Sequence, residues 1–277
     1  MGFLDKLSAS IARRRSMLCV GLDPTLDGLP EGIVRSPEGM LAFNRAIVEA
    51  THDLVCAYKP NLAFYEALGT EGWRVLAETI RLVPDGIPVI ADAKRGDTSS
   101  TAAAYASAIF DVLGADACTV NPYLGSDGIL PFVDRPGRFA FVLCRTSNPS
   151  AGELQDLEAD GLPLYLHIAR RAATEAGGWG GPTRCGLVVG TTDPFAAGRV
   201  VDLAPDSWLL APGLGAQGGD VVATAAALGP AVVRTLWSAS RSITGAGRGR
   251  DFATQARAAA ERLRDEINRA TVAGGAS

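Results

Sequence analysis

The sequence is poor in the residues that several common kinds of site require. Among its 277 residues there are only two histidines, His52 and His167, and neither lies near a candidate Cys or Ser partner in the chain. The five cysteines show no CxxC or metal-ligand spacing, and each lies in or beside an apolar run. We therefore expect no histidine-based triad and no bound metal, and we interpret the cysteines as buried, reduced side chains.

The chain also lacks long apolar runs and an excess of basic charge. No stretch reaches 18 apolar residues, so no membrane-spanning helix is predicted. The net charge of −4 argues against a dominant nucleic-acid-binding surface. The amphipathic stretch 3–11 precedes a run of three arginines instead of following a basic segment, which does not match a secretory signal. These features predict a cytoplasmic protein with no membrane or nucleic-acid partner.

Lysine is scarce, and its placement is informative. Of 26 Lys and Arg residues only three are lysines, namely Lys6, Lys59 and Lys94. Lys59 and Lys94 both follow apolar runs, at the ends of predicted strands. Because lysine, unlike arginine, can give up a proton, a chemical role is favoured for these two residues over surface decoration.

Eight short apolar runs alternate with helix-like patterns along the chain. Eight such repeats in about 250 residues are typical of a (β/α)8 TIM barrel, predicted here as a single domain over residues 1–277. A helix at 3–14 is expected to cover the barrel bottom. A doubly wound sheet is the alternative, but no GxGxxG follows the first strand. The predicted strands are 17–22, 54–58, 88–91, 117–120, 139–143, 186–189, 208–211 and 232–237. The predicted helices are 37–51, 71–82, 98–113, 154–176, 194–203, 220–228 and 251–270.

The stretch PVIADAKRGD brings three ionisable side chains to the end of the third predicted strand. Since residues i and i+2 of a strand face the same side, Asp92 and Lys94 are expected to project together. An ordinary ion pair, with Asp97 capping the following helix, is the structural alternative. On one barrel rim Asp23 and Lys59 would join these residues, giving an alternating set of acids and amines.

The loops after the seventh and eighth predicted strands indicate a phosphate-binding site. Four glycines precede a predicted helix start near Asp220, and such loops let backbone amides approach an anion closely. Arg241 follows the eighth strand, and the loops after strands seven and eight of a barrel commonly hold phosphate. Tight turns alone remain an alternative explanation for the glycines. The later stretch 244–250 is a weaker phosphate candidate and is interpreted as a flexible surface loop. The four glycines are Gly213, Gly215, Gly218 and Gly219.

Six motifs occur in order between residues 17 and 243, and together they resemble the orotidine 5′-phosphate decarboxylase family in its long bacterial, mycobacterial-type form. The resemblance implies decarboxylation of orotidine 5′-phosphate to UMP and carbon dioxide in pyrimidine synthesis, with no cofactor and no metal. The motifs are GLDP at 21–24, YKPN at 58–61, DAKRGD at 92–97, TSNP at 146–149, PGLGAQGGD at 212–220 and SRS at 240–242.

The resemblance also implies roles for single residues. Lys94 is implied to donate a proton to C6 of the pyrimidine, with Asp92 near the substrate carboxylate. Asp97, with Thr98 beside it, is implied to reach into the neighbouring subunit's site, which requires a homodimer. The remaining implied contacts are Asp23 and Lys59 with the ribose hydroxyls, Ser147 with the pyrimidine, and Gln217 and Arg241 with the phosphate.

Two features depart from the family pattern, and two other functions stay open. Ser240 stands where many relatives have Gly, and the segment 150–182, interpreted as a mobile lid loop and an extended helix, is longer than in compact relatives. A hexulose-phosphate synthase of the same barrel superfamily is one alternative. Such enzymes generally use a divalent metal, to which the ammonium of Lys59 is poorly suited as a ligand. A non-enzymatic barrel that binds a phosphorylated ligand is the other.

Overall fold

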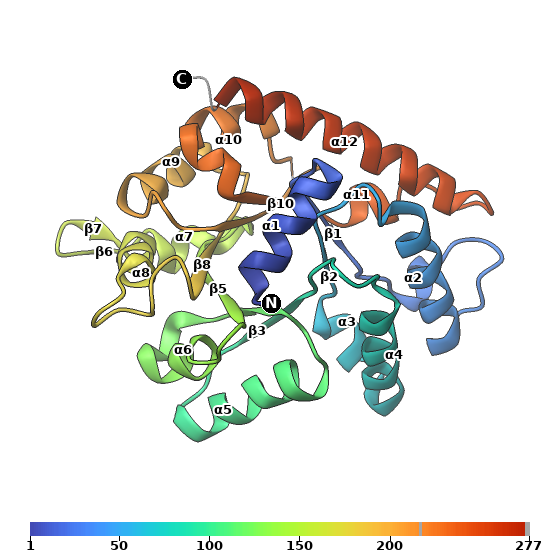
Figure 1. The fold of residues 1–277 in the computed structure, drawn as a ribbon, viewed down its shortest axis with the longest axis horizontal. Helices are drawn as coiled ribbons and strands as arrows, with labels where there is room; N and C mark the ends of the chain where they lie inside the picture. The colour runs from blue at the N-terminus through green and yellow to red at the C-terminus, as the bar shows by residue number, and fades with distance from the viewer. Residues whose placement is uncertain (216–217, 275–277) are drawn as a thin grey trace.

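Parallel strands surround a common axis in the computed structural model, which describes residues 1–215 and 218–274 (Figure 1). The eight-stranded sheet has the order β2-β1-β10-β9-β8-β5-β4-β3, and isolated parallel bridges Tyr58–Val89 and Asn61–Asp92 join its two outer strands. The sheet is thus nearly closed, which confirms the predicted TIM barrel over the doubly wound alternative. The strands are β1 (Leu18–Gly21), β2 (Ala57–Lys59), β3 (Ile90–Arg95), β4 (Ala117–Val120), β5 (Phe139–Arg145), β8 (Cys185–Val189), β9 (Leu209–Pro212) and β10 (Thr235–Ala239).

The strands form where the chain is apolar on both faces, because the barrel interior covers one face and the helices cover the other. All residues of β1, β2, β4, β8 and β10 are buried. The surrounding helices are α2 (Pro37–Thr51), α3 (Leu62–Glu66), α4 (Gly69–Leu82), α5 (Ser99–Ser107), α6 (Ser126–Val133), α7 (Gly152–Gln155), α8 (Leu164–Ala173), α9 (Pro194–Leu203), α10 (Val221–Leu228), α11 (Arg241–Thr244) and α12 (Phe252–Gly274).

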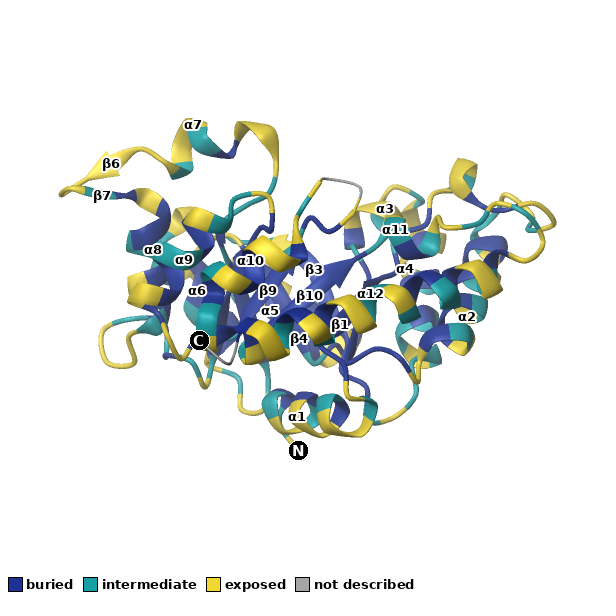
Figure 2. Cartoon of the chain, turned by 90° about the horizontal axis from the view of Figure 1, so that it is seen from above, coloured by how far each residue is buried: buried dark blue, intermediate teal, exposed yellow. Residues whose placement is uncertain are grey.

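The predicted N-terminal helix is confirmed as α1 (Phe3–Arg14), which lies across the amino end of the barrel (Figure 2). Its Phe3 ring stacks on Phe139 with a centroid distance of 5.0 Å and meets Phe141 edge-on at 5.9 Å. These contacts close the bottom of the core. The segments α3, α7 and α11 lie at the opposite end, where the carboxyl ends of the strands are.

The long helix predicted at 154–176 is wrong. In its place the chain forms α7, a hairpin of β6 (Glu158–Ala159) and β7 (Leu162–Pro163), and then α8. The turn between the two short strands is Asp160–Gly161, with φ angles of 49° and 74°. Two consecutive residues at positive φ make the tight hairpin turn that Asp-Gly favours, and this local signal interrupts the helical pattern.

Smaller differences concern element boundaries. The eighth strand begins at Thr235 rather than 232, because Gly229 and Pro230 start a 3₁₀ segment, η5 (Gly229–Arg234). The helix predicted at 98–113 begins at Ser99 and changes after Ser107 into a π-helical turn, η2 (Ala108–Val112). The strand predicted at 88–91 extends to Arg95. Asp92 and Lys94 therefore lie within the strand rather than after it.

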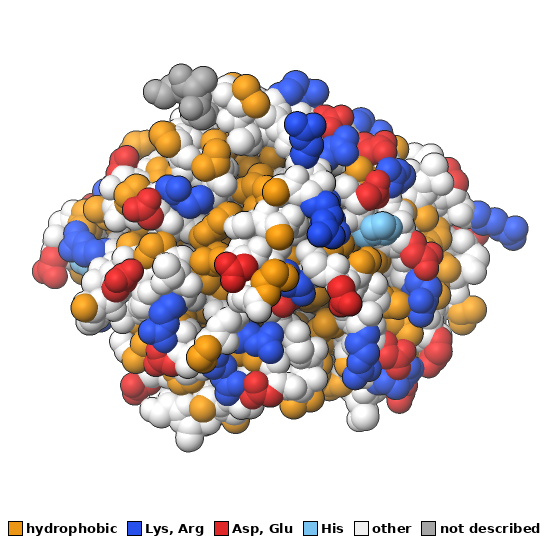
Figure 3. All heavy atoms as spheres, viewed as in Figure 1, with side chains coloured by type: hydrophobic (Ala, Val, Ile, Leu, Met, Phe, Trp, Pro, Cys, Tyr) orange, Lys and Arg blue, Asp and Glu red, His pale blue; other side chains and the backbone are white. Residues whose placement is uncertain are grey.

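The surface carries both signs of charge. Lys and Arg side chains are interspersed with Asp and Glu over the face seen from the α1 end (Figure 3). No helix among the described residues is both long enough and apolar enough to cross a membrane.

Candidate active site

Two lysines and one aspartate meet at the carboxyl ends of β2 and β3. The Lys59 ammonium donates to Asp92 Oδ2 at 2.8 Å, and the Lys94 ammonium donates to Asp92 Oδ1 at 2.6 Å. One carboxylate therefore holds two amines, each on a different oxygen. The sequence prediction that Asp92 and Lys94 project together is met by these distances.

The cluster combines deep burial with full charge. Lys59 is 6% exposed and Asp92 is 8% exposed, whereas the Lys94 side chain is 48% exposed. Burial alone would raise the pKa of Asp92, but the charges of Lys59 and Lys94 outweigh it and hold that pKa well below its usual range. Burial alone would likewise lower the pKa of Lys59, but Asp92 and then Asp23 outweigh it and raise that pKa. Both buried groups are therefore ionised at neutral pH.

Lys94 is held in an unusual backbone conformation. Its φ angle is 47°, in the left-handed region, and the pairing of β3 with β4 shifts register between Ala91 and Arg95. A non-glycine residue in this region is strained by about 1–2 kcal/mol. Strain of this kind persists only where surrounding contacts fix it, and it is frequent at functional sites.

Thr119 of β4 is a member of the site that the sequence did not reveal. Its hydroxyl donates to Asp92 Oδ1 at 2.9 Å, and its oxygen accepts from the Lys94 backbone N–H at 2.9 Å. Thr119 is fully buried. It therefore fixes both the central carboxylate and the strained backbone, and its only signal in the sequence is a hydroxyl within an apolar strand.

Asp23 lies beside this cluster, after β1. Its Oδ1 accepts from the Asn61 backbone N–H at 3.0 Å, which ties the loop after β1 to the loop after β2. The chains approach closely here, because a Cβ on Gly21 would lie 2.7 Å from Ser240 Cβ and 2.9 Å from Asp23 Oδ2. Glycine at position 21 lets the loop after β10 reach the acidic side of the site.

A cavity of about 550 Å³ opens beside these residues. Asp23, Lys59 and Arg241 all line this cavity, which lies at the carboxyl end of the barrel. Gly245 and Arg248 also border it, so the stretch 244–250, predicted to be a flexible surface loop and a weaker phosphate candidate, contributes to the lining of the cavity. The other described residues that line the cavity include Asn61, Phe64, Gly213, Leu214, Ser238, Ser240 and Thr244.

The glycine-rich loop after β9 is tightly folded. Gly219 N–H donates to the Gly213 carbonyl at 3.1 Å, and Gly213, Gly215 and Gly218 have φ angles of 112°, 73° and 77°. A Cβ on Gly219 would lie 2.0 Å from Thr191 Oγ1, so only glycine fits there. Gln217, a predicted phosphate contact, lies outside the described residues.

Three predicted residues lie apart from the Lys59–Asp92–Lys94 cluster. Ser147 follows β5, where it packs against Gly190: a Cβ on Gly190 would lie 2.7 Å from Ser147 Cβ. Asp97 Oδ1 accepts from the Thr98 backbone N–H at 2.7 Å, and no hydrogen bond or ion pair joins Asp97 to the cluster within the described part of the chain. The N-cap position of α5 belongs to Thr98, so the helix-cap alternative for Asp97 is not what the structure has.

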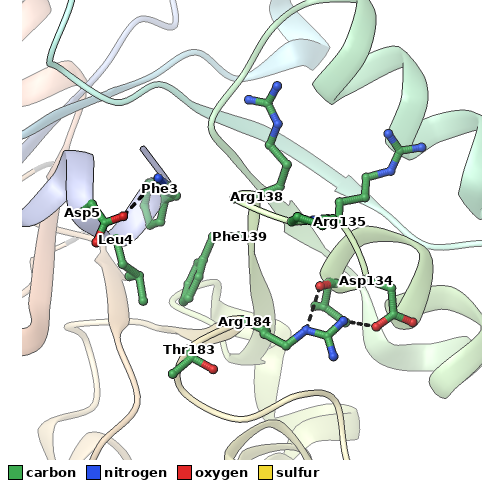
Figure 4. A pocket seen from close by; sticks show the side chains of 13 residues that line it. Phe3, Leu4, Asp5, Asp134, Arg135, Arg138, Phe139, Thr183 and Arg184 are labelled. Atoms are coloured by element: carbon green, nitrogen blue, oxygen red, sulfur yellow. Dashed lines mark hydrogen bonds and ion pairs between the residues drawn. The ribbon is translucent and has the colours of Figure 1, made fainter.

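A second cavity, of about 490 Å³, lies at the amino end between α1 and the turn before β5 (Figure 4). Phe3 and Phe139 line it, together with Arg138 and Arg184. Arg184 donates to the Val133 carbonyl at 3.0 Å, and Arg138 donates to the Ala115 carbonyl at 2.8 Å. These arginines hold the barrel bottom together, which agrees with a structural role for this end.

Within the described residues, no group of three or more His, Cys, Asp and Glu side chains is arranged to hold a metal ion. The ionisable groups that do gather are amines and carboxylates at the carboxyl ends of barrel strands. Catalytic residues of TIM barrels come from this end. The fold and the cluster together define a TIM barrel of the enzyme type, with a lysine–aspartate network at the end where such barrels carry their active sites.

Comparison with known proteins identifies the family. Residues 16–256 match the model of the orotidine 5′-phosphate decarboxylase / HUMPS family. A relative from Thermomicrobium roseum, named orotidine 5′-phosphate decarboxylase, is 52% identical over 97% of this chain and 96% of its own. The chain therefore belongs to the orotidine 5′-phosphate decarboxylase family of enzymes, and the predicted resemblance is confirmed.

Solved structures agree in fold. The chain is similar to Leishmania donovani OMP decarboxylase, with 40% identity and a TM-score of 0.85 over 98% of this chain and 99% of that one. It is also similar to Leishmania donovani UMP synthase, with 43% identity and a TM-score of 0.88. That match covers 98% of this chain but only 57% of the UMP synthase chain.

Proposed function

We propose that the chain, as a single domain over residues 1–277, converts orotidine 5′-phosphate to UMP and carbon dioxide in cytoplasmic pyrimidine synthesis, without cofactor or metal. The observation that carries the proposal is the Asp92 carboxylate bound by two ammonium groups, at 2.8 and 2.6 Å, of which that of Lys59 lines the cavity described above. Family membership and the names of the relatives support the same reaction.

Lys94 is the proton donor in this proposal. When the bond between C6 and the carboxyl carbon breaks, its electron pair stays on C6 and carbon dioxide leaves. The Lys94 ammonium stabilises that developing negative charge and then transfers its proton to C6. Support comes from the side chain, which is half exposed and can meet a ligand, while Asp92 and Thr119 fix its position.

Asp92 has two roles in the proposed reaction. It keeps Lys59 and Lys94 charged and oriented, and it faces the substrate carboxylate as a like charge. That repulsion disappears as carbon dioxide leaves, so it acts on the substrate more than on the transition state.

The remaining residues bind the substrate in this proposal. Asp23 and Lys59 hold the ribose hydroxyls, and Ser147 contacts the pyrimidine. Arg241 and Gln217 hold the phosphate. Support for Arg241 is its place on the same cavity as Asp23 and Lys59, beside the closely folded glycine loop. Phosphate contacts remote from C6 can contribute to the chemical step through loop closure.

The active form is proposed to be a homodimer in which Asp97 and Thr98 complete the partner's site. Within the described part of one chain, no hydrogen bond or ion pair joins Asp97 to the Lys59–Asp92–Lys94 cluster, which supports a role in trans. Subunit complementation tests this directly. Mixed and re-annealed Lys94→Ala and Asp97→Ala chains should regain about a quarter of wild-type activity per total site, since one heterodimer site then carries both native residues, whereas each variant alone stays inactive.

The test of the reaction follows the absorbance of orotidine 5′-phosphate with chelator-treated protein. We expect metal-free turnover that is lost in Lys94→Ala, because no other amine of the cluster replaces the half-exposed ammonium. Binding of UMP without turnover by the wild type would instead favour the phosphate-ligand barrel. Turnover only of a sugar phosphate, and only with added divalent metal, would favour a hexulose-phosphate synthase.

A further inference from the structure

The end of β5 is held by side chains from the segment that follows it. The guanidinium of Arg145 meets both carboxylate oxygens of Asp156, with Nε–Oδ1 and Nη2–Oδ2 distances of 3.0 Å each. The same guanidinium lies 3.8 Å from Asp193 Oδ2, and its Nη1 donates to the Thr146 carbonyl at 3.2 Å. The Arg145 side chain is 14% exposed and the Asp156 side chain 48% exposed, so the arginine end of this two-point contact is shielded while the carboxylate end reaches solvent.

Gln155 binds the next residue from the same side. Its Oε1 accepts from the Thr146 backbone N–H at 2.8 Å, and its Nε2 donates to Thr146 Oγ1 at 2.8 Å. Both backbone polar groups of Thr146 are therefore bound by side chains, namely those of Gln155 and Arg145. The four-residue helix α7 that carries Gln155 is too short to be stable by itself, so these contacts also fix α7 against the barrel.

Ser147 is confined from the other side by the loop after β8. The Gly190 backbone N–H donates to the Arg145 carbonyl at 2.8 Å. A Cβ on Gly190 would lie 2.7 Å from Ser147 Cβ and 2.9 Å from its backbone nitrogen. Ser147 thus has a fixed residue before it and a close wall beside it, and its backbone has little room to move.

We propose that Arg145, Gln155 and Asp156 are positioning residues that set the direction of Ser147 toward the pyrimidine ring. The proposal rests on the function proposed above, in which Ser147 contacts the base. It assigns a task to the segment 149–163, which the sequence suggested was only a mobile lid and part of a helix. None of the three side chains has to touch the substrate, because each acts through the backbone of Thr146 or the end of β5.

The test compares two ligands by calorimetry, UMP and ribose 5-phosphate, which lacks the base. Gln155→Ala removes the acceptor for the Thr146 N–H, and Asp156→Asn removes the charge opposite Arg145. Each should weaken UMP binding about three- to tenfold, the size of one or two hydrogen bonds, and leave ribose 5-phosphate binding within twofold. Gln155→Glu keeps the acceptor oxygen, and Thr146 Oγ1 lies 3.3 Å from it, so this variant should bind UMP nearly as the wild type does.

Glu153→Gln is the matched control, because Glu153 is exposed on the same helix and faces no partner among the ion pairs of the described residues. A double-variant cycle gives the sharper result. If Gln155 acts through Ser147, then Gln155→Ala in a Ser147→Ala background should cost less than twofold further in UMP affinity.

Equal weakening of both ligands, or full additivity with Ser147→Ala, would overturn the proposal, since either result means a general structural effect. If the wild type binds UMP and all the variants bind it equally well, the positioning role of Arg145, Gln155 and Asp156 is overturned while the proposed function stands. If the wild type binds UMP no more tightly than ribose 5-phosphate, the base contributes no affinity, and both the proposed function and the positioning role are overturned. Should Gln155→Ala fail to fold, Asp156→Asn and Gln155→Glu still give opposite expectations for UMP.

Discussion

Replacing Asp92 with Asn is expected to destabilise the protein more than replacing Lys59 with Met, although both changes break the same ion pair. Asp92 receives both ammonium groups and the Thr119 hydroxyl, so its loss leaves two cations at 2.8 and 2.6 Å from a neutral amide. Loss of Lys59 leaves Asp92 still paired with Lys94. The Asp92 carboxylate is thus the common partner of both amines, whereas each amine has Asp92 as its partner in the network.

The magnitudes follow from burial. Breaking a buried ion pair by neutralising one partner typically costs about 3–5 kcal/mol, because a buried charge is left without its counter-charge. Asn retains an acceptor oxygen, so we expect about 3 kcal/mol for Asp92→Asn. For Lys59→Met we expect about 1–2 kcal/mol, since Met fills the volume of the lysine stem and Lys94 still neutralises Asp92. The Lys94 side chain is 48% exposed, which limits how much it compensates.

Acid titration tests the same reasoning independently. Burial opposes ionisation of Asp92, but Lys59 and Lys94 outweigh it and hold the pKa of Asp92 below its usual range. A carboxyl with a lowered native pKa stabilises the protein fully above its unfolded pKa of about 3.9, and this contribution is lost as pH falls towards the native pKa. The stability gap between wild type and Asp92→Asn should therefore be constant from pH 7 to pH 5 and shrink below about pH 4.

Urea unfolding followed by tryptophan fluorescence at pH 7, 5 and 3.5 measures both expectations. The reasoning is refuted if Lys59→Met costs as much as Asp92→Asn at pH 7. It is equally refuted if the gap between wild type and Asp92→Asn widens on acidification. Unfolding must be reversible for these free energies to hold, which refolding from urea checks.

Three further predictions concern strain, thiols and packing. Lys94→Gly should be about 0.5–1 kcal/mol more stable than Lys94→Ala in urea unfolding, because both lose the amine but only Gly relieves a φ of 47°; equal stabilities would mean that the backbone is unstrained. Burial raises the pKa of Cys19, Cys144 and Cys185 to about 12, and all five free cysteines are buried. A thiol reagent at pH 8 should therefore label the native protein slowly and the urea-unfolded protein at five sites. Rapid labelling of the native chain would contradict this. Phe3→Ala should cost about 3–5 kcal/mol through lost aromatic packing while leaving KM unchanged, and a raised KM would show that the barrel bottom communicates with the site.

The barrel and the main cluster were predictable because their signals are local. Parallel barrel strands are buried on both faces, so they read as short apolar runs, and polar residues after such runs fall on one rim. For this reason the sequence predicts that Lys59, Asp92 and Lys94 lie on the same rim of the barrel. Two lysines in an arginine-rich chain gave the additional chemical signal.

Other features depend on contacts between distant parts of the chain. Thr119 lies 27 residues from Asp92, and a single threonine in an apolar strand does not reveal which carboxylate it binds. The same holds for Gln155, because a single glutamine nine residues after Thr146 does not reveal that a short helix places it against the end of β5. The hairpin at Asp160–Gly161 follows this helix. There the helical pattern dominated the prediction, although the Asp-Gly turn signal was present.

Two of the buried groups that lack a hydrogen-bond partner in the described part of the chain lie at the carboxyl end of the barrel, and they bear on function. The amino end is closed by aromatic stacking and by arginines bonded to carbonyl groups. At the carboxyl end, Lys94 is strained, and the Ser240 and Ser242 hydroxyls are buried without a hydrogen-bond partner among the described residues. An unpaired buried hydroxyl costs about 1–3 kcal/mol, so a ligand that supplies a partner recovers that free energy on binding. Ser240 borders the cavity and abuts Gly21. If an oxygen of the bound ligand satisfies the Ser240 hydroxyl, Ser240→Gly should weaken that ligand while stabilising the free protein, and the opposite signs of these two effects separate binding from simple loss of packing.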